Sequence, residues 1–83
     1  MLIAFDSTQQ ALRAEMLLEY ADIEIDTRPT PKEITAGCAL SIEFPDDDLQ
    51  QVGGIIISEN VEVRGIFQAS AEGGYELVTG WEA

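Results

Sequence analysis

Apolar and polar positions alternate along this chain in two different periods, which predict strands and helices in turn. Residues 2–5 form a continuous apolar run of strand length, which is typical of a buried β-strand. Ser7, with Gln10 three residues later, has the capping-box pattern that begins a helix. Small and apolar residues then recur at helical spacing to the end of that segment: Ala11, Ala14, Leu17, Leu18 and Ala21. The pattern predicts a strand followed by a helix that ends near residue 22.

Two further strands are predicted around a loop that contains two prolines. Residues 23–27 alternate apolar and polar side chains, which is the period of a strand. We expect Pro29 and Pro31 to end this strand, because proline has no N–H to donate to the ladder. The loop closes at Gly37, where we expect a positive φ. Residues 39–44 alternate again, with Leu40 on the inner side.

A second helix is predicted after an acidic start. Asp46 is a plausible N-cap, and the aspartates that follow it suit the positive end of a helix dipole. Three apolar residues share one face of this helix: Leu49, Val52 and Ile56. Gly53 and Gly54 weaken the helix, so a strand over residues 55–58 remains the alternative. We expect Asn60 to occupy the left-handed position at the helix C-terminus.

The remaining residues predict a strand and a C-terminal β extension. Residues 61–68 have the composition of a strand, with a bulge at Gly65. A turn at 69–74 leads to a last short strand at 75–79. The order β-α-β-β-α-β is that of a ferredoxin-like α+β sandwich with an antiparallel sheet. We expect a single domain over residues 1–83, with a core at 1–68 and a hairpin or tail at 69–83.

A sheet with both helices on one face leaves its other face open. We expect a second copy of the chain, in a homodimer, or the C-terminal tail to cover that face. The candidate covering residues are Tyr75, Leu77 and Trp81.

The chain is strongly acidic, with a formal net charge of −12 and only four Lys and Arg residues in total. This balance argues against nucleic acid and anionic membrane surfaces as partners, because both need a basic face. No apolar run approaches the roughly 18 residues of a membrane span, and the N-terminus does not resemble a secretory signal. The acidity suits solubility and self-repulsion. Docking to a basic partner, or mimicry of DNA charge, is the alternative interpretation.

The residue types present exclude several kinds of chemistry. There is no histidine and only one cysteine. An internal disulfide is therefore impossible, a zinc site is poorly supported, and Ser-His or Cys-His catalysis within one chain is excluded. We expect no metal, no cofactor, and a carrier or accessory protein more readily than a free-standing enzyme. A reduced thiol with no secretory signal predicts a cytoplasmic location.

Cys38 is the candidate reactive residue. Two of the four cations of the chain, Arg28 and Lys32, lie within ten residues of it. Nearby cations favour a thiolate, and backbone amides around Gly37 could hold an anion. Free cysteines are, however, among the most buried residues, and Cys38 lies in phase with the inward Leu40. Structural packing is thus the competing interpretation of Cys38.

The segment PTPKEITAGCALSIEF, at residues 29–44, is similar to the bacterial selenium/sulfur carrier protein-like family. The resemblance covers about residues 2–67. It includes the opening LIAF and the later VEVRGIF. Within the central segment, Pro31, Lys32, Ile34, Thr35 and Cys38 match the family pattern position by position. Ala39 stands where the family usually has glycine, which puts in doubt a role that needs backbone freedom after the thiol.

The resemblance implies a carrier that accepts sulfur or selenium on Cys38 from a donor protein and passes it to an acceptor protein. The substrate-binding residues would be Arg28, Lys32, Thr35 and Gly37. Two alternatives stay open. One is a non-catalytic module that binds a small ligand or forms a dimer, and the other is an acidic partner mimic.

Overall fold

Strand β1 (Leu2–Ala4) is the central strand of this computed structural model, which describes residues 1–81. It pairs antiparallel with β3 (Leu40–Glu43) on one side and β4 (Gly65–Ala69) on the other. The edge strands are β2 (Asp26–Pro29) beside β3 and β5 (Tyr75–Leu77) beside β4, and both pair antiparallel. The sheet order is β2-β3-β1-β4-β5.

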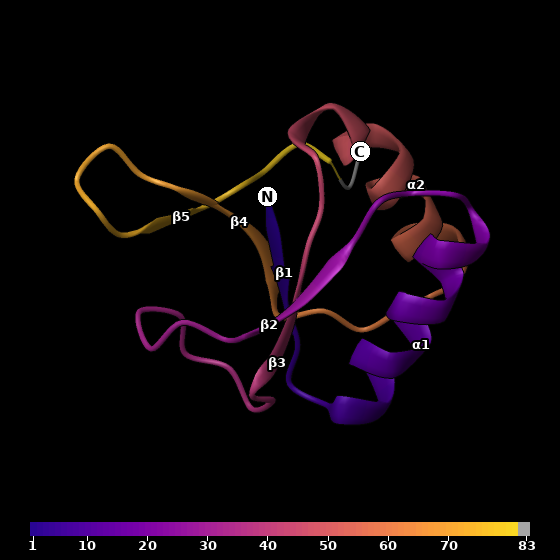
Figure 1. Cartoon of the computed structure of the whole chain (residues 1–83), viewed down its shortest axis with the longest axis horizontal. Helices are drawn as coiled ribbons and strands as arrows, with labels where there is room; N and C mark the ends of the chain where they lie inside the picture. The colour runs from indigo at the N-terminus through magenta and orange to yellow at the C-terminus, as the bar shows by residue number, and fades with distance from the viewer. Residues whose placement is uncertain (82–83) are drawn as a thin grey trace.

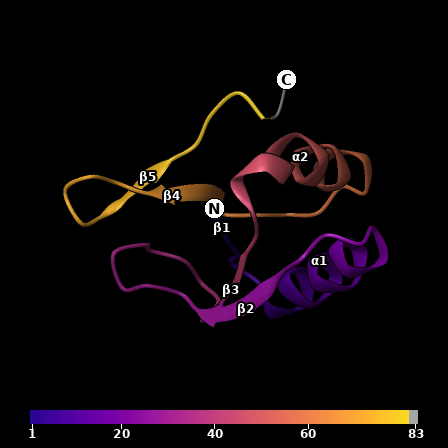
Figure 2. The same cartoon turned by 45° about the horizontal axis from the view of Figure 1, so that its top comes forward.

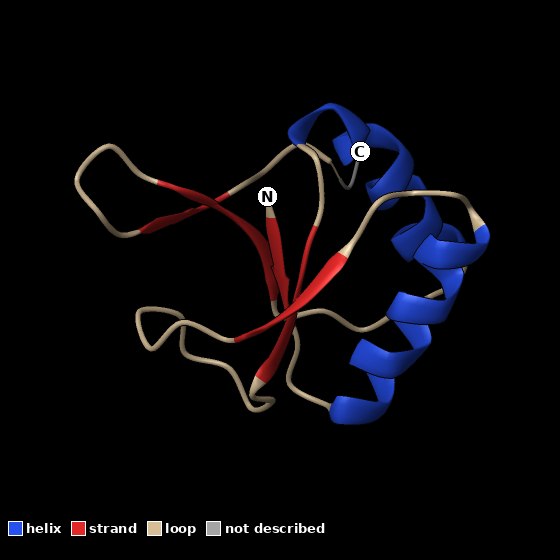
Figure 3. Ribbon diagram, in the orientation of Figure 1, coloured by secondary structure: helices blue, strands red, loops and turns tan. Residues whose placement is uncertain are grey.

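Two helices accompany this sheet. Along the chain, α1 (Thr8–Tyr20) follows β1, and a short 3-10 turn, η1 (Asp46–Asp48), leads into α2 (Leu49–Ser58) after β3. Both helices lie on the same side of the sheet (Figure 1). Residues 1–81 therefore form a small α+β structure with a five-stranded antiparallel sheet and two α-helices (Figure 3).

The main core lies between the sheet and the helices. Successive residues of a strand point to opposite faces, so Ile3 and Phe5 of the first strand segment face the helices together. Small residues on the inner side of α1 let it approach the sheet closely. The fully buried members of this core are Ile3, Phe5, Ala11, Ile42, Val52 and Ile66.

The opposite face of the sheet carries a second, smaller apolar cluster. Leu2 and Ala4 point to that face, and Ile34, from the loop between β2 and β3, packs on them with an exposed fraction of only 6%. That loop and the β4–β5 hairpin both project away from the helices (Figure 2). The loop thus covers part of the face that we expected a second copy or the tail to cover.

The tail packs on its own chain, on the helix side. Trp81 is 9% exposed and belongs to the main core. Its indole N–H donates to the Val78 carbonyl oxygen at 3.1 Å, and a Cβ on Gly53 of α2 would lie 3.1 Å from its ring. Trp81 therefore does not cover the open face, whereas Tyr75 and Leu77 of β5 remain largely exposed.

The predicted second helix is confirmed, and the alternative strand over residues 55–58 is wrong. Burial of Val52 and Ile56 against the core outweighs the weak helix propensity of the glycine pair. Asn60 has the expected left-handed conformation, with φ of 58°. Gly65 begins β4 without a bulge, since its register with β1 is continuous.

The start of α1 and the end of β2 differ from expectation in detail. Ser7 is the N-cap of α1, but its side chain makes no capping hydrogen bond, and the Gln10 amide oxygen instead accepts from the Glu62 N–H at 3.1 Å. Pro29 belongs to β2, which begins at residue 26 and not at residue 23. An edge strand tolerates proline, because one side of its backbone has no partner.

Candidate functional site

The junction of β1 and β3 positions Cys38. These strands are antiparallel, with Ala4 opposite Ser41, so the end of β1 lies beside the start of β3. The Cys38 N–H donates to the Phe5 carbonyl oxygen at 3.0 Å, just before β3 begins. Its side chain joins the helix-side core and is 4% exposed. The expected phase with Leu40 is therefore found, and the thiol is largely buried.

Two polar groups contact the sulfur. Cys38 Sγ lies 3.4 Å from Thr8 Oγ1 and accepts a hydrogen bond from the Leu40 N–H at 3.3 Å. Thr8 is the first residue of α1. Helices leave the N–H groups of their first turn without intrahelical partners and carry partial positive charge there. The sulfur thus lies next to the end of a helix that favours negative charge.

A shallow depression of about 390 Å³ at the protein surface has Cys38 among its lining residues. It lies where the first turn of α1 meets the edge strand β2 and the segment before β3. Its lining residues besides Cys38 are Thr8, Thr27, Arg28, Pro29, Ala39 and Leu40. The depression offers room for a small group bonded to the sulfur, although the cysteine itself is almost covered.

The segment before Cys38 is held by a hydrogen bond within the loop and by side chains from β3 and from the residues before β4. The Thr30 hydroxyl donates to the Cys38 carbonyl oxygen at 3.0 Å and accepts from the Ser41 hydroxyl at 2.6 Å. Arg64, just before β4, donates from Nε to the Thr35 carbonyl oxygen at 3.1 Å. These contacts fix the loop at its start, near Thr30, and again near Thr35.

Gly37 is required for a different reason from the one we expected. Its φ is not positive, so that prediction is wrong. A Cβ on Gly37 would instead lie 2.7 Å from the Asp6 carbonyl oxygen, which is closer than a side chain tolerates. The Gly37 N–H donates to Asp6 Oδ1 at 2.8 Å. The glycine allows the cysteine loop to touch the end of β1.

The predicted cations do not contact the sulfur. Arg28 Nε donates to Glu43 Oε1 at 2.8 Å, and a second nitrogen lies 3.9 Å from Asp26 Oδ2. Glu43 lies opposite Leu2, so this pair is on the sheet face away from the helices, whereas Cys38 is on the helix side. Lys32 is exposed and forms no ion pair within residues 1–81. Their roles in substrate binding stay predictions.

Sequence reasoning missed the residues that the topology brings to the cysteine. Thr8, which contacts the sulfur, is 30 residues from Cys38 in the sequence. Asp6 and Arg64 are also distant in sequence, and they contact Gly37 and Thr35 of the cysteine loop. The signal available was the antiparallel pairing implied by the predicted fold. That pairing places the residues after the first strand beside those before the third.

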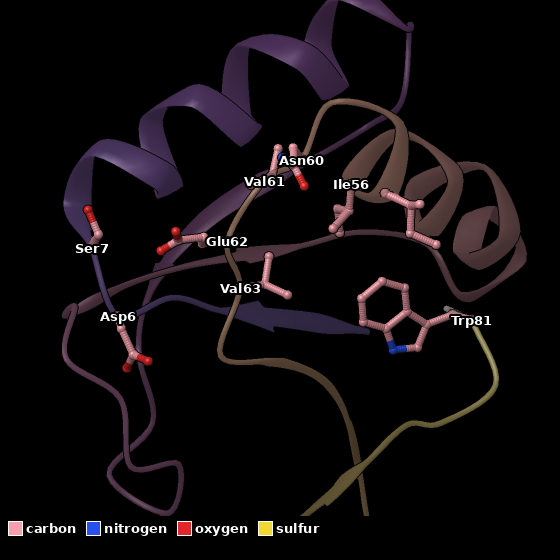
Figure 4. Close-up of a pocket in the computed structure, with 9 residues that line it drawn as sticks. Asp6, Ser7, Ile56, Asn60, Val61, Glu62, Val63 and Trp81 are labelled. Carbon is pink, nitrogen blue, oxygen red and sulfur yellow. The ribbon is translucent and has the colours of Figure 1, made fainter. Parts of the chain in front are cut away.

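A separate cavity lies on the other side of Asp6 and Ser7. Its volume is about 510 Å³, and it extends to the tail, where Trp81 forms one wall (Figure 4). The apolar residues Ile56, Val61 and Val63 line it between these ends. Cys38 is not among its lining residues, so this cavity is distinct from the depression at the sulfur.

The described part of the chain offers neither a membrane span nor a metal centre. None of its helices has both the length and the apolar character needed to cross a bilayer. Among residues 1–81, no three Cys, Asp or Glu side chains gather in a way that could hold a metal ion.

Comparison with known proteins identifies a family. A family model described as "Putative Se/S carrier protein-like" matches residues 1–68, which include the cysteine loop and both helices. The match ends in β4 and leaves out the hairpin turn, β5 and Trp81. No curated protein and no solved structure matches the chain.

Proposed function

Because the chain belongs to the Se/S carrier protein-like family, we propose that it carries sulfur or selenium on Cys38. A donor protein loads the cysteine, and an acceptor protein unloads it. The carrier would work in the cytoplasm, where cysteines stay reduced. The order of its elements and the central position of β1 between β3 and β4 support a ferredoxin-like arrangement with an added strand, β5.

One observation carries this proposal: the sulfur of the chain's only cysteine has two hydrogen-bond partners, and the cysteine lines a surface depression. Leu40 N–H and Thr8 Oγ1 both lie within 3.4 Å of Cys38 Sγ. Cysteines whose only role is packing rarely need a polar shell, because they behave as small apolar residues. Donors directed at the sulfur stabilise charge on a bound sulfur or selenium.

The loading step needs no external oxidant when the donor is itself a persulfide. The Cys38 thiolate attacks the terminal sulfur of the donor, and a new S–S bond forms on Cys38. The S–S bond of the donor breaks, and its electron pair leaves on the donor cysteine as a thiolate. The transferred sulfur is now the outer sulfur of a Cys38 persulfide. In unloading, an acceptor thiolate attacks that outer sulfur, and Cys38 leaves as a thiolate.

The amides that hold the terminal anion differ from those that the sequence suggested. The Gly37 N–H is bonded to Asp6 Oδ1, and the Cys38 N–H is bonded to the Phe5 carbonyl oxygen. Neither is free for a bound anion. We assign this role to the first-turn amides of α1 and to the Thr8 hydroxyl, which faces the sulfur.

Loading of Cys38 by tetrasulfide, measured by mass spectrometry, tests the proposal. The wild-type protein should gain one sulfur atom that dithiothreitol removes, and Cys38→Ser should gain none. Cys38→Ala should keep the fold with some loss of stability, because it removes a buried side chain, and it should also gain no sulfur. If the folded wild-type protein gains no sulfur under conditions that load free cysteine, the carrier function is wrong.

Burial favours a second candidate, a non-catalytic module that binds a ligand or forms a dimer. Cys38 is 4% exposed, as a packing residue would be. Alkylation by iodoacetamide separates the two functions. Reaction of the folded protein without unfolding, even at a rate below that of a free thiol, supports the carrier. Reaction only after unfolding, together with a stable dimer in sedimentation, supports the module.

A further inference from the structure

A row of exposed apolar side chains on α1 lies outside the two buried clusters. Leu12, Met16 and Tyr20 are 50%, 68% and 95% exposed. Residues four apart lie one above the next on a helix, so the three form a continuous row. Thr8 is four residues before Leu12 and begins the same row, and its hydroxyl lies 3.4 Å from Cys38 Sγ. The row therefore starts at the sulfur.

Two acidic side chains border this row on one side. Glu15 and Glu19 lie on the same helix, and neither forms an ion pair with any of residues 1–81. Arg13 is the one cation in the α1 sequence, and its guanidinium is engaged by Glu59, through a 2.6 Å bond to the carbonyl oxygen. An apolar row with an acidic border matches a partner surface that is apolar with a basic border.

We propose that this row, the α1 stripe (Thr8, Leu12, Met16 and Tyr20), docks the protein that delivers sulfur to Cys38. The inference rests on the carrier function proposed above. The partner bears a cysteine persulfide bordered by apolar and basic side chains. Because the sulfur is almost covered, a protein donor must be held over the depression for the transfer to occur. A surface that begins at Thr8 holds it there.

The size and charge of the stripe favour a transient partner of this kind over a second copy of the chain. Three large side chains are far fewer than the roughly 20–30 residues on each side of a stable interface. A second copy would bring the same acidic border against this one, and like charges disfavour that contact. A donor that must leave after each transfer suits a small interface.

Loading rates from donors with and without a protein surface test the stripe. The small donor is tetrasulfide. The protein donors are two cysteine desulfurases, charged with cysteine and then desalted, one with a basic and one with an acidic surface around its persulfide. The variant is Leu12→Gln with Met16→Gln, because glutamine has a helix propensity close to that of leucine and methionine. Ile57→Gln is the matched control, since Ile57 is 49% exposed on α2.

We expect the double variant to load about tenfold more slowly from the basic desulfurase, which is the size of effect that loss of a contact residue gives. Loading from tetrasulfide should stay within about twofold of wild type, and Ile57→Gln should match wild type with every donor. Added salt should slow transfer from the basic desulfurase. The basic enzyme should load the wild-type protein faster than the acidic one.

Three results would overturn the proposal that the α1 stripe docks the donor protein. They are equal rates for wild type and double variant from the basic desulfurase, faster transfer from the acidic enzyme, and loading by tetrasulfide but by neither enzyme. A dimer that the double variant abolishes, with transfer unchanged, would assign the row to a second copy instead. Failure of tetrasulfide to load the wild type is a separate result, because that reagent needs no docking, and it rejects the carrier function itself.

Discussion

Gly37 and Asp6 touch through both backbone and side chain. The Gly37 N–H donates to Asp6 Oδ1 at 2.8 Å, and a Cβ on Gly37 would lie 2.7 Å from the Asp6 carbonyl oxygen. Residues 31 positions apart in the sequence are thus held in contact one residue before the thiol. This contact joins the loop that carries Cys38 to the segment that begins α1.

Gly37→Ala should destabilise the protein by about 1–3 kcal/mol, because the backbone of Asp6 cannot move away as a flexible side chain could. Urea denaturation followed by circular dichroism measures this change. Gly54→Ala is the matched control: nothing lies within 4 Å of a Cβ there, and the helix should gain up to about 1 kcal/mol. Equal stabilities for the two variants would contradict the close contact at Gly37.

Trp81→Ala should cost about 3 kcal/mol of unfolding free energy, since the ring is buried in the core of its own chain. The loss should not depend on protein concentration. Deletion of residues 79–83 should have a similar effect. A variant that unfolds at the wild-type urea concentration, or a loss that appears only at dimer-forming concentrations, would show that the tail does not stabilise its own chain.

Arg64→Gln should speed alkylation of Cys38 several-fold while changing stability by at most about 1 kcal/mol, because the side chain is half exposed. Arg64 holds the Thr35 carbonyl oxygen and lies 3.6 Å from Asp6 Oδ2, so its loss loosens the cysteine loop. Arg13→Gln, which removes a comparable arginine bonded to Glu59, should leave the alkylation rate unchanged. Identical alkylation rates of Cys38 in the two variants would show that Arg64 does not hold the cysteine loop.

Thr8→Val should shorten the lifetime of a Cys38 persulfide roughly fivefold, as expected for loss of one hydrogen bond of about 1 kcal/mol. Valine keeps the shape of threonine, so the fold should be unaffected. Thr27→Val is the control, because Thr27 lines the same depression and has no side-chain hydrogen bond to the sulfur. The persulfide is quantified over time by trapping and mass spectrometry. If both variants keep the wild-type lifetime, Thr8 does not hold the bound sulfur.

The helices and most strands could be predicted because their signals are local. Alternation placed Cys38 in phase with Leu40, and helical spacing placed Val52 and Ile56 on one buried face. The end of β2 was missed because the effect of Pro29 depends on whether its strand lies at the edge of the sheet. The sheet order decides that property, and no single segment of sequence contains it.

The candidate site was predicted only in its central residue. Nearness in sequence suggested that Arg28 would act on the thiol, but strand alternation directs its guanidinium to Glu43 on the opposite face. The groups that do contact the sulfur include Thr8, which is 30 residues away. Thr8 lies close to Cys38 because of the register between β1 and β3, and that register is known only once the strands are paired.

The segment that presents Cys38 also shields the far face of the sheet, because Ile34 lies over Leu2 and Ala4. Local unfolding of this segment would therefore expose residues on both faces of the sheet to solvent at once. Amide hydrogens of Ile34 and Cys38 should exchange with solvent as one unit, even though their side chains point to opposite layers. Any opening of this segment that exposes Cys38 therefore also exposes the smaller apolar cluster on the far face of the sheet.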